Sequence, residues 1–405
     1  MSRFFEVLTG TLVRNRSRMP GWMRRMMESA ARNPDGLIGR LSARLLGGGS
    51  VSVTEVPDAA VRVYIAPTNY SGQGYLWARA LERADPAIGA RNMAVQLPGG
   101  FAFPADTLVP IASVNASAEW AAAEWEAARQ FSHVLVEAER SMFGKHFDRN
   151  LEAEAAALEE AGVSVAFLCH GTDIRDPRRH AKATPWSPYP EDPRTETLQA
   201  DAEKNLALLE RLKRPTFIST PDLAVDLPGA NWCPVIADVR RFASEAPIFP
   251  GAPVRVIHTS SDPLQKGSNH IEPALVPLIK AGSLTYELIT GVSSIEMPGV
   301  IAGADIVLDQ FRLGSYGVAA CEAMAAGRIV VGHVLPQVRE RVEQESGLPL
   351  PIVEATPETL HDVVAGLIED PERASRIAEQ GPPFVSAVHS GEASARALLT
   401  HWILK

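Results

Sequence analysis

The sequence predicts an α/β protein made of two parallel-sheet domains, and two observations lead to that fold class. Short apolar runs rich in β-branched residues alternate with segments of helical period over residues 61–385, which is typical of parallel sheets covered by helices. A stretch rich in proline and glycine, residues 245–253, divides the alternation into two cycles. Two Rossmann-like domains that face one cleft are the economical architecture for such a chain.

The elements of both cycles follow from the same alternation. In the first cycle we expect strands at 61–66, 94–97, 133–137, 163–169 and 216–219, and helices at 75–83, 117–130, 151–161 and 195–212. In the second we expect strands at 254–258, 284–289, 305–308, 328–332 and 351–353, and helices at 270–281, 316–326, 337–344, 357–367 and 371–379. The proline-rich stretch 177–193 is expected to be a long irregular loop of the kind that forms lids.

The domain boundaries predicted from these cycles are as follows. A basic extension occupies residues 1–50, a first Rossmann-like domain occupies 51–245, and a second Rossmann-like domain occupies 246–385. The last segment, 386–405, is expected to form a separate C-terminal helix.

Composition excludes several classes of protein. Apolar residues make up 46% of the 405 residues and charged residues 21%, as in ordinary globular proteins. The net charge of −9 argues against a nucleic-acid partner, because phosphate contacts need clustered Lys and Arg. The three cysteines, Cys169, Cys233 and Cys321, stand too far apart for a disulfide framework or a CxxC-type zinc site. A reducing, cytoplasmic location fits this pattern best.

The first 50 residues differ in charge from the rest of the chain. They carry nine Arg against three acidic residues, with Phe, Trp, Met and Leu interspersed, as in helices that rest on an anionic membrane surface. No apolar run reaches the ~18 residues that span a bilayer, and Glu6 interrupts any signal-peptide core. Two interpretations stay open: an amphipathic extension packed on the protein itself or on a second subunit, and peripheral contact with the inner face of the membrane.

In open α/β sheets, ligands bind beyond the carboxyl ends of the strands, and polar segments follow four of the predicted strands. The first segment holds Gly72, Gln73 and Gly74, where two glycines at the start of a helix allow backbone amides to approach an anion. The third glycine of the dinucleotide-binding fingerprint is absent, which weakens a dehydrogenase interpretation. A purely structural turn is the alternative.

The second segment follows the strand at 163–169 and holds His170, Asp173 and Arg175. A lone histidine is more often structural than functional. Its place at a strand's carboxyl end, with Gly171 and Asp173 following, makes a functional role an equal alternative.

The third segment, after the strand at 254–258, holds Ser260, Ser261 and Lys266. A lysine with hydroxyl and amide donors nearby is a plausible phosphate site, although the spacing is not that of a P-loop. An isolated surface lysine is usually only solvated, and that alternative remains.

The fourth segment combines the turn Gly314, Ser315, Tyr316 and Gly317 with Glu322 on the helix that follows. The neighbours of Glu322 on that helix are Ala, Val, Cys and Met, so its carboxylate needs a partner. A capped helix with one buried glutamate is the structural alternative.

These residues resemble a known family. The third and fourth segments look like the carboxyl-terminal domain of nucleotide-sugar-dependent glycosyltransferases of the GT-B fold, particularly the large retaining family that includes sucrose synthase and bacterial mannosyltransferases. The resemblance extends more weakly to Gly72–Gly74 and to His170-Gly-Thr-Asp173, and covers about residues 61–385. It implies that Lys266 binds the donor diphosphate and that Glu322 holds the nucleotide ribose.

The same resemblance makes 51–245 the acceptor-side domain and 246–385 the donor domain, and it implies that the helix at 386–405 crosses back to the first domain. It places Asp173 and Arg175 at the acceptor side or in a lid, and it gives roles to the other segments. The amides of Ser315, Tyr316 and Gly317 would approach the sugar and diphosphate, and His170 would lie near the transferred sugar. Two positions depart from the family pattern. The first glutamate of Glu-x7-Glu is replaced by Gly314, and the arginine that often precedes the diphosphate lysine is missing. Chains with this glycine preceded by Asp-Gln-Phe look like a branch of the family.

The implied activity is transfer of a sugar from a nucleoside diphosphate sugar to a hydroxyl acceptor, with retention at the anomeric carbon. The chain holds no Asp-x-Asp triplet, so we expect no metal ion and no further cofactor. The acceptor could be lipid-linked or polymeric, in cell-envelope or polysaccharide synthesis. Two alternatives remain: a nucleotide-sugar epimerase, and a non-catalytic scaffold or binding subunit that lost the first glutamate.

Overall fold

The structure is a computed structural model that describes residues 52–97, 103–260 and 262–405. The described chain forms two compact units: the part up to Leu168 with Leu212–Pro215, and Cys169–Arg211 with Thr216–Lys405. The predicted basic extension lies outside the described residues, so its packing and its membrane contact stay predictions. Among the helices that are described, none is both long enough and apolar enough to cross a bilayer.

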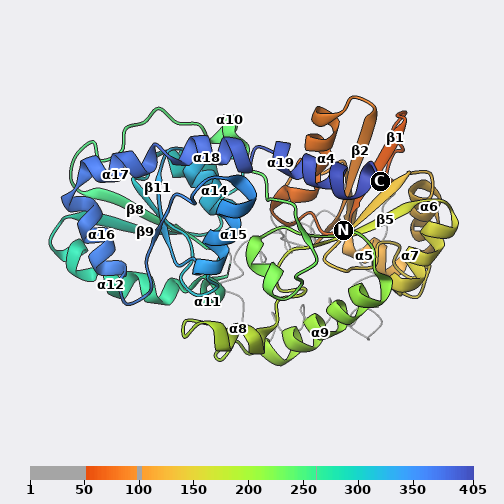
Figure 1. Ribbon diagram of the computed structural model, residues 1–405, viewed down its shortest axis with the longest axis horizontal. Helices are drawn as coiled ribbons and strands as arrows, with labels where there is room; N and C mark the ends of the chain where they lie inside the picture. The colour runs from red at the N-terminus through yellow and green to blue at the C-terminus, as the bar shows by residue number, and fades with distance from the viewer. Residues whose placement is uncertain (1–51, 98–102, 261) are drawn as a thin grey trace, which may run out of the picture. The chain divides into compact units, whose positions relative to one another are not determined.

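The first sheet has seven strands in the order β3-β2-β1-β4-β5-β6-β7 (Figure 1). They are β1 Val61–Ala66, β2 Ile88–Gln96, β3 Thr107–Pro110, β4 His133–Glu137, β5 Ser164–Cys169, β6 Thr216–Ile218 and β7 Asn231–Trp232. Pairing is parallel, as between β1 and its neighbours β2 and β4. Parallel strands need crossover connections, and the intervening helices supply them.

The helices before residue 254 in the chain often begin at residues that cap them. They are α4 Gln73–Ala84, α5 Ile111–Ala116, α6 Ala118–Ala128, α7 Leu151–Glu160, α8 Pro177–Ala183, α9 Thr195–Leu212 and α10 Val239–Phe242, with 3₁₀ turns η2 Tyr70–Gly72 and η3 Pro221–Val225. Ser117, Asn150 and Asp176 each accept a hydrogen bond from an amide in the first turn of the next helix. Such caps explain why α6, α7 and α8 start where they do.

The second sheet has five strands in the order β12-β11-β10-β8-β9, also parallel. They are β8 Val254–Thr259, β9 Leu284–Ile289, β10 Ile306–Leu308, β11 Ile329–Gly332 and β12 Ile352–Glu354. The helices are α11 Pro263–Lys266, α12 Ser268–Lys280, α13 Met297–Ala302, α14 Val318–Ala325, α15 Pro336–Ser346, α16 Leu360–Glu369, α17 Pro371–Ala378, α18 Gly381–Val388 and α19 Glu392–Leu398, followed by a π-helix over Leu399–Ile403.

A continuous apolar core fixes the second sheet. Strand residues such as Val256, Leu308 and Val331 are fully buried together with Leu275 of α12 and Val364 of α16. Helix α16 packs against α12 and against α17, while α14 packs on β11 and on α18 (Figure 1). Burial of these side chains holds the carboxyl ends of β8 and β10 next to each other, and those ends carry the candidate site.

The predicted α/β class and the parallel sheets are confirmed, and several element boundaries differ from the sequence prediction. The strand expected at 94–97 is the end of the longer strand β2, and the short strands β3 and β7 were not predicted. The stretch 177–193 is not wholly irregular, because α8 occupies its first seven residues with Pro177 in the first turn. Proline suits that position, since its missing N–H would have no helical partner there.

Candidate functional site

Lys266 lies at the carboxyl end of β8, on the one-turn helix α11. Its Nζ donates to the backbone oxygen of Thr259 at 3.0 Å and to Asp309 Oδ1 at 3.3 Å. Asp309 directly follows β10, and its side chain is 3% exposed, against 20% for Lys266. The ammonium group is therefore oriented by a buried carboxylate and retains a face toward solvent, where an anion could reach it.

Several buried polar atoms next to Lys266 lack a partner within the described residues. They are Asp309 Oδ2, Thr259 Oγ1 and Ser260 Oγ. Buried polar groups are normally hydrogen-bonded, so a cluster of such atoms marks a place that a ligand or water can satisfy. Ser261, which was also predicted here, lies outside the described residues.

The Gly314–Gly317 turn requires glycine at its first position. Gly314 has φ +65°, and a Cβ atom there would lie 2.5 Å from Leu335 Cγ. The amide of Leu335 also donates to the Gly314 oxygen at 2.9 Å. A glutamate, which the resembling family carries at this position, would be strained by this backbone and by Leu335, so the glycine suits the turn in this chain.

We expect Gly314→Ala to lower the free energy of unfolding by ~2–4 kcal/mol, because a left-handed conformation and the contact with Leu335 both oppose a side chain. Gly317→Ala is the matched control, since a Cβ there meets no atom within 4 Å and φ is negative. Urea denaturation measures both. Equal losses in the two variants would contradict this account of Gly314, and Leu335→Ala should recover part of the Gly314→Ala loss.

The rest of the turn presents backbone amides, while its side chains point elsewhere. Ser315 Oγ donates to Asp222 Oδ1 at 2.6 Å, and the buried Tyr316 hydroxyl lies 3.2 Å from His389 Nε2. The amides of Ser315, Tyr316 and Gly317 donate no hydrogen bond within the described part of the chain. Helix α14 begins at Val318, two residues later than predicted, and Gly317 is its N-cap residue. The free amides of the turn are therefore followed directly by the free amides of the first turn of the helix.

Glu322 lies on α14 and is partly buried. Burial raises the pKa of its carboxyl to about 7, against the opposing charges of Arg241 and Lys266. Its side chain accepts no hydrogen bond from any described residue. The structure thus brings Glu322 into the field of Lys266, with two carboxyl oxygens ready to accept hydrogen bonds.

This raised pKa makes a pH-dependent prediction for Glu322→Gln. A carboxyl whose pKa is higher in the folded than in the unfolded state stabilises at low pH and loses that stabilisation as pH rises toward 7. Glutamine does not ionise, so the variant keeps its stability as pH rises. Its free energy of unfolding should therefore exceed the wild-type value by more at pH 8 than at pH 5. Binding of the nucleoside diphosphate should weaken in the variant. Urea denaturation at both pH values tests the first part. The same difference at pH 5 and pH 8 would contradict it.

A segment of residues 186–194, here called the strap, holds the Lys266 region from two sides. The guanidinium of Arg312, which is 3% exposed, donates to the backbone oxygens of Trp186 and Ser187 and to both carboxyl oxygens of Glu191, at 2.8–3.0 Å. Bidentate contacts of this kind fix geometry as well as adding stability. Arg312 also packs so closely on Gly267 that a Cβ there would lie 2.8 Å from its Cγ.

At its other end the strap contacts α11. Asp192 accepts from Gln265 Nε2 at 2.7 Å, and Arg194 lies 2.8 Å from Asp262, the residue that caps α11. Asp192 is buried, and hydrogen bonds from Arg194 and Gln265 outweigh the effect of its burial and lower its pKa. The strap therefore contacts Gln265, the residue just before Lys266, and holds Arg312, which packs on Gly267, the residue just after it. These contacts limit where the lysine can move.

His170 and Asp173 form a compact turn after β5. Asp173 accepts from the amides of His170, at 2.7 Å, and of Gly171, and its own backbone oxygen accepts from Asn205 Nδ2 at 2.9 Å. Asp173 thus fixes the backbone that presents His170, which is partly exposed. The proposed place of His170 near the transferred sugar stays a prediction.

Arg175 forms a buried ion pair. Its Nη2 lies 2.6 Å from Asp222 Oδ2, and both side chains are less than a tenth exposed. Asp222 in turn accepts from Ser315, so the segment after β5 is joined to the Gly314–Gly317 turn. This internal partner supports the turn, and the predicted role of Arg175 at the acceptor side or lid is untested.

The predicted loop at Gly72, Gln73 and Gly74 belongs to the first unit. Gly72 has φ +76°, and a Cβ at Gly74 would lie 2.5 Å from Asn92 Nδ2. The buried Glu137, at the end of β4, accepts from the amides of Thr68 and Asn69. The helix begins at Gln73, two residues earlier than expected, and all three predicted residues are buried.

Several site residues were not predicted from the sequence. Asp309 could have been predicted, because it is the first residue after a strand, the same kind of position that pointed to Lys266. Arg312 and Asp222 had none, because their importance arises from partners about 90 to 126 positions away. Arg241, whose charge acts on Glu322, precedes the predicted domain junction and carries no motif.

The fold and this arrangement define a class of protein. Two parallel α/β sheets, of seven and five strands, are the fold of the GT-B glycosyltransferases among the solved structures. Sucrose-phosphate synthase from Thermosynechococcus elongatus shares the fold with a TM-score of 0.54 and 12% identity, over 82% of this chain and 96% of that one. Anabaena HepE, in a complex with UDP and glucose, matches with a TM-score of 0.52 and 11% identity, over 83% and 98%.

One curated relative is similar in sequence. Alpha-D-kanosaminyltransferase from Streptomyces kanamyceticus is 32% identical over 135 residues, which is 33% of this chain and 34% of the relative. The match therefore spans about a third of either protein. No family model matches the chain. The fold predicted from the sequence, GT-B, is confirmed by the solved structures.

Proposed function

We propose that this protein is a glycosyltransferase that moves a sugar from a nucleoside diphosphate sugar to a hydroxyl acceptor. The observation that carries the proposal is the Lys266 arrangement: an ammonium held by Asp309, the free amides of Ser315–Gly317, and the carboxyl of Glu322 within the field of that ammonium. Cation and amides suit a diphosphate, and a carboxyl without a partner suits the two hydroxyls of a ribose.

The similar proteins support the same donor class. HepE is a GT-B protein seen with UDP and with UDP-glucose, and the kanosaminyltransferase is a sugar transferase by name. Because the sequence match covers only a third of the chain, the donor and the activity rest on the site residues named above.

The mechanism that we propose stabilises charge as the donor bond breaks. The sugar becomes oxocarbenium-like while the diphosphate leaves with growing negative charge. Lys266 and the amides at the start of α14 offset that charge from fixed positions. Asp309 and the strap hold the lysine, and the hydrogen bond from Ser315 to Asp222 holds the turn. This arrangement supplies the positive charge without a metal ion. We propose retention at the anomeric carbon by direct front-face transfer, in which the acceptor attacks from the side that the diphosphate leaves. Such a transfer requires no protein nucleophile.

The acceptor in this proposal is a hydroxyl compound, with a lipid-linked glycan or a cell-envelope polymer as the first class to test. The basic extension 1–50 motivates this choice, because its arginines would attract the chain to an anionic membrane surface from the cytoplasm. Vesicle sedimentation with and without residues 1–50 tests that part separately. Equal sedimentation of the two proteins would remove the membrane from the proposal.

The activity itself is tested by incubating the purified protein with UDP-, GDP-, ADP- and TDP-sugars and measuring nucleoside diphosphate release, first alone and then with a panel of acceptors. A transferase releases the diphosphate of one donor faster when an acceptor is present. Conversion of a donor to an isomer without any acceptor would indicate an epimerase instead. No release from any donor, together with no nucleotide binding, would indicate a scaffold.

A further inference from the structure

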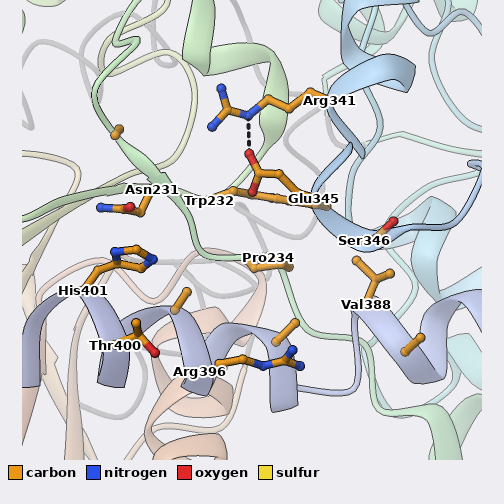
Figure 2. Close-up of a pocket in the computed structure, with 14 residues that line it drawn as sticks. Asn231, Trp232, Pro234, Arg341, Glu345, Ser346, Val388, Arg396, Thr400 and His401 are labelled. Carbon is orange, nitrogen blue, oxygen red and sulfur yellow. Dashed lines mark ion pairs between the residues drawn. The ribbon is translucent and has the colours of Figure 1, made fainter. Parts of the chain in front are cut away.

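A hollow with a volume of about 440 Å³ lies among β7, α15, α18 and α19 (Figure 2). All of its lining residues belong to the second unit, and none of them is a predicted donor-binding residue. Part of the space exists because small side chains line it, namely those of Ala230, Ala387, Ala393 and Ala397. The volume falls in the range of about 300–1,000 Å³ in which proteins bind small molecules.

The polar side chains around the hollow carry an excess of positive charge. Arg341 and Glu345 form an ion pair with 2.7 Å between Nε and Oε1, so the one lining carboxylate is neutralised. Across from that pair, Figure 2 shows Arg396, Thr400 and His401 projecting from the C-terminal helices. Within the described residues, the side chain of Arg396 has no hydrogen bond or ion pair. An arginine without a counter-charge beside a hollow attracts an anion.

A π-helix places two of these side chains, Thr400 and His401, beside the hollow. Helix α19 continues directly into the π-helix Leu399–Ile403, which carries Thr400 and His401. π-Helical turns are rare and frequently occur at functional sites, since the wider turn changes which side chains share a face. Here Arg396 from α19 and His401 from the π-helix both line the hollow. The rest of the polar lining, including Asn231 and Thr400, offers neutral donors and acceptors to hydroxyl groups.

We propose that this hollow is a second ligand site that binds a small hydroxylated anion of the size of a sugar phosphate. In this proposal Arg396 binds the anionic group, and neutral side chains such as Asn231 and Thr400 bind the hydroxyl groups. Arg341, on the opposite wall, stays paired with Glu345. The proposal does not depend on the glycosyltransferase activity, because none of these residues belongs to the donor site.

The test is calorimetric titration of the full chain with glucose 6-phosphate, inorganic phosphate and glucose as probes. Titrations are run on the wild type and on Lys266→Ala, which removes the anion site predicted for the donor. We expect glucose 6-phosphate to bind both proteins. Arg396→Ala should weaken this binding at least ~10-fold, since a charged hydrogen bond to phosphate is lost. Ala397→Phe, which fills the hollow without changing any charge, should abolish it.

Arg376→Ala is the matched control, because Arg376 is exposed on α17 and lies outside the lining. It should bind glucose 6-phosphate like the wild type. The absence of binding to every probe would overturn the proposal. So would binding that Lys266→Ala abolishes, or binding that Ala397→Phe leaves intact. Glucose binding that is insensitive to Arg396→Ala would overturn the assignment of an anionic ligand. Binding of inorganic phosphate without binding of glucose 6-phosphate would overturn the assignment of a hydroxylated ligand.

Discussion

Lys266→Ala is expected to lower kcat/KM for the nucleoside diphosphate sugar at least ~10-fold, which corresponds to about 1.4 kcal/mol of transition-state stabilisation. The reason is the loss of the ammonium that Asp309 holds in place and that, in the proposed function, faces the leaving diphosphate. Initial rates at several donor concentrations measure the effect. A decrease in kcat as well as an increase in KM is expected, because the charge on the diphosphate grows as the bond breaks.

A matched control separates this effect from a general loss of positive charge. Lys280, exposed at the end of α12, is a lysine outside the site, and Lys280→Ala should retain the wild-type kcat/KM. Removing Lys266 also leaves the buried Asp309 without its cation, so the folded state of the variant must be verified by its thermal transition. Unchanged kcat/KM in a folded Lys266→Ala protein would contradict the assignment of this lysine to the diphosphate.

Arg175→Ala is expected to lower the free energy of unfolding by ~3–5 kcal/mol, the cost of leaving a buried charge without its partner. Burial alone would raise the pKa of Asp222, but the charge of Arg175 and the hydrogen bond from Ser315 lower it below its usual value. A lowered carboxyl pKa contributes stability at neutral pH that is lost as pH falls and the group is protonated. The difference between wild type and variant should therefore shrink in acid.

Arg178→Ala provides the comparison, because Arg178 pairs with Glu196 on the exposed surface, where ion pairs contribute little. Its free energy of unfolding should stay within ~0.5 kcal/mol of the wild type. Chemical denaturation at neutral pH measures both variants. A loss below ~1 kcal/mol for Arg175→Ala would contradict a buried structural pair and would favour the predicted role at the acceptor side.

The sequence predicted most of the fold because hydrophobic periodicity is local. The strands Val61–Ala66, His133–Glu137 and Leu284–Ile289 and the helix Thr195–Leu212 have the bounds that the pattern indicated. The exceptions are elements whose pattern is weak. The strand Asn231–Trp232 has two residues, and the helix Pro177–Ala183 sits in a proline-rich stretch where its cap, Asp176, is the main signal.

The candidate site was only partly predictable, and the reason is physical. Lys266 and Glu322 could be found because each stands close to the end or start of an element that the pattern locates. Asp309 directly follows a strand and could have been found in the same way, although its pairing with Lys266 appears only in the folded chain. Arg312 could not be found, because it acts through the strap, more than 100 positions earlier in the chain. The requirement for glycine at position 314 likewise depends on Leu335, which only the folded chain places beside it.

The central claim is that Lys266, the turn amides and Glu322 form a nucleoside diphosphate pocket. Calorimetric titration of the metal-free protein with UDP, GDP, ADP and TDP tests it most directly. We expect one of the four to bind selectively, with a micromolar dissociation constant, and to lose that binding in Lys266→Ala. Absence of binding by all four, or equal binding of one of them by Lys266→Ala, would contradict the claim.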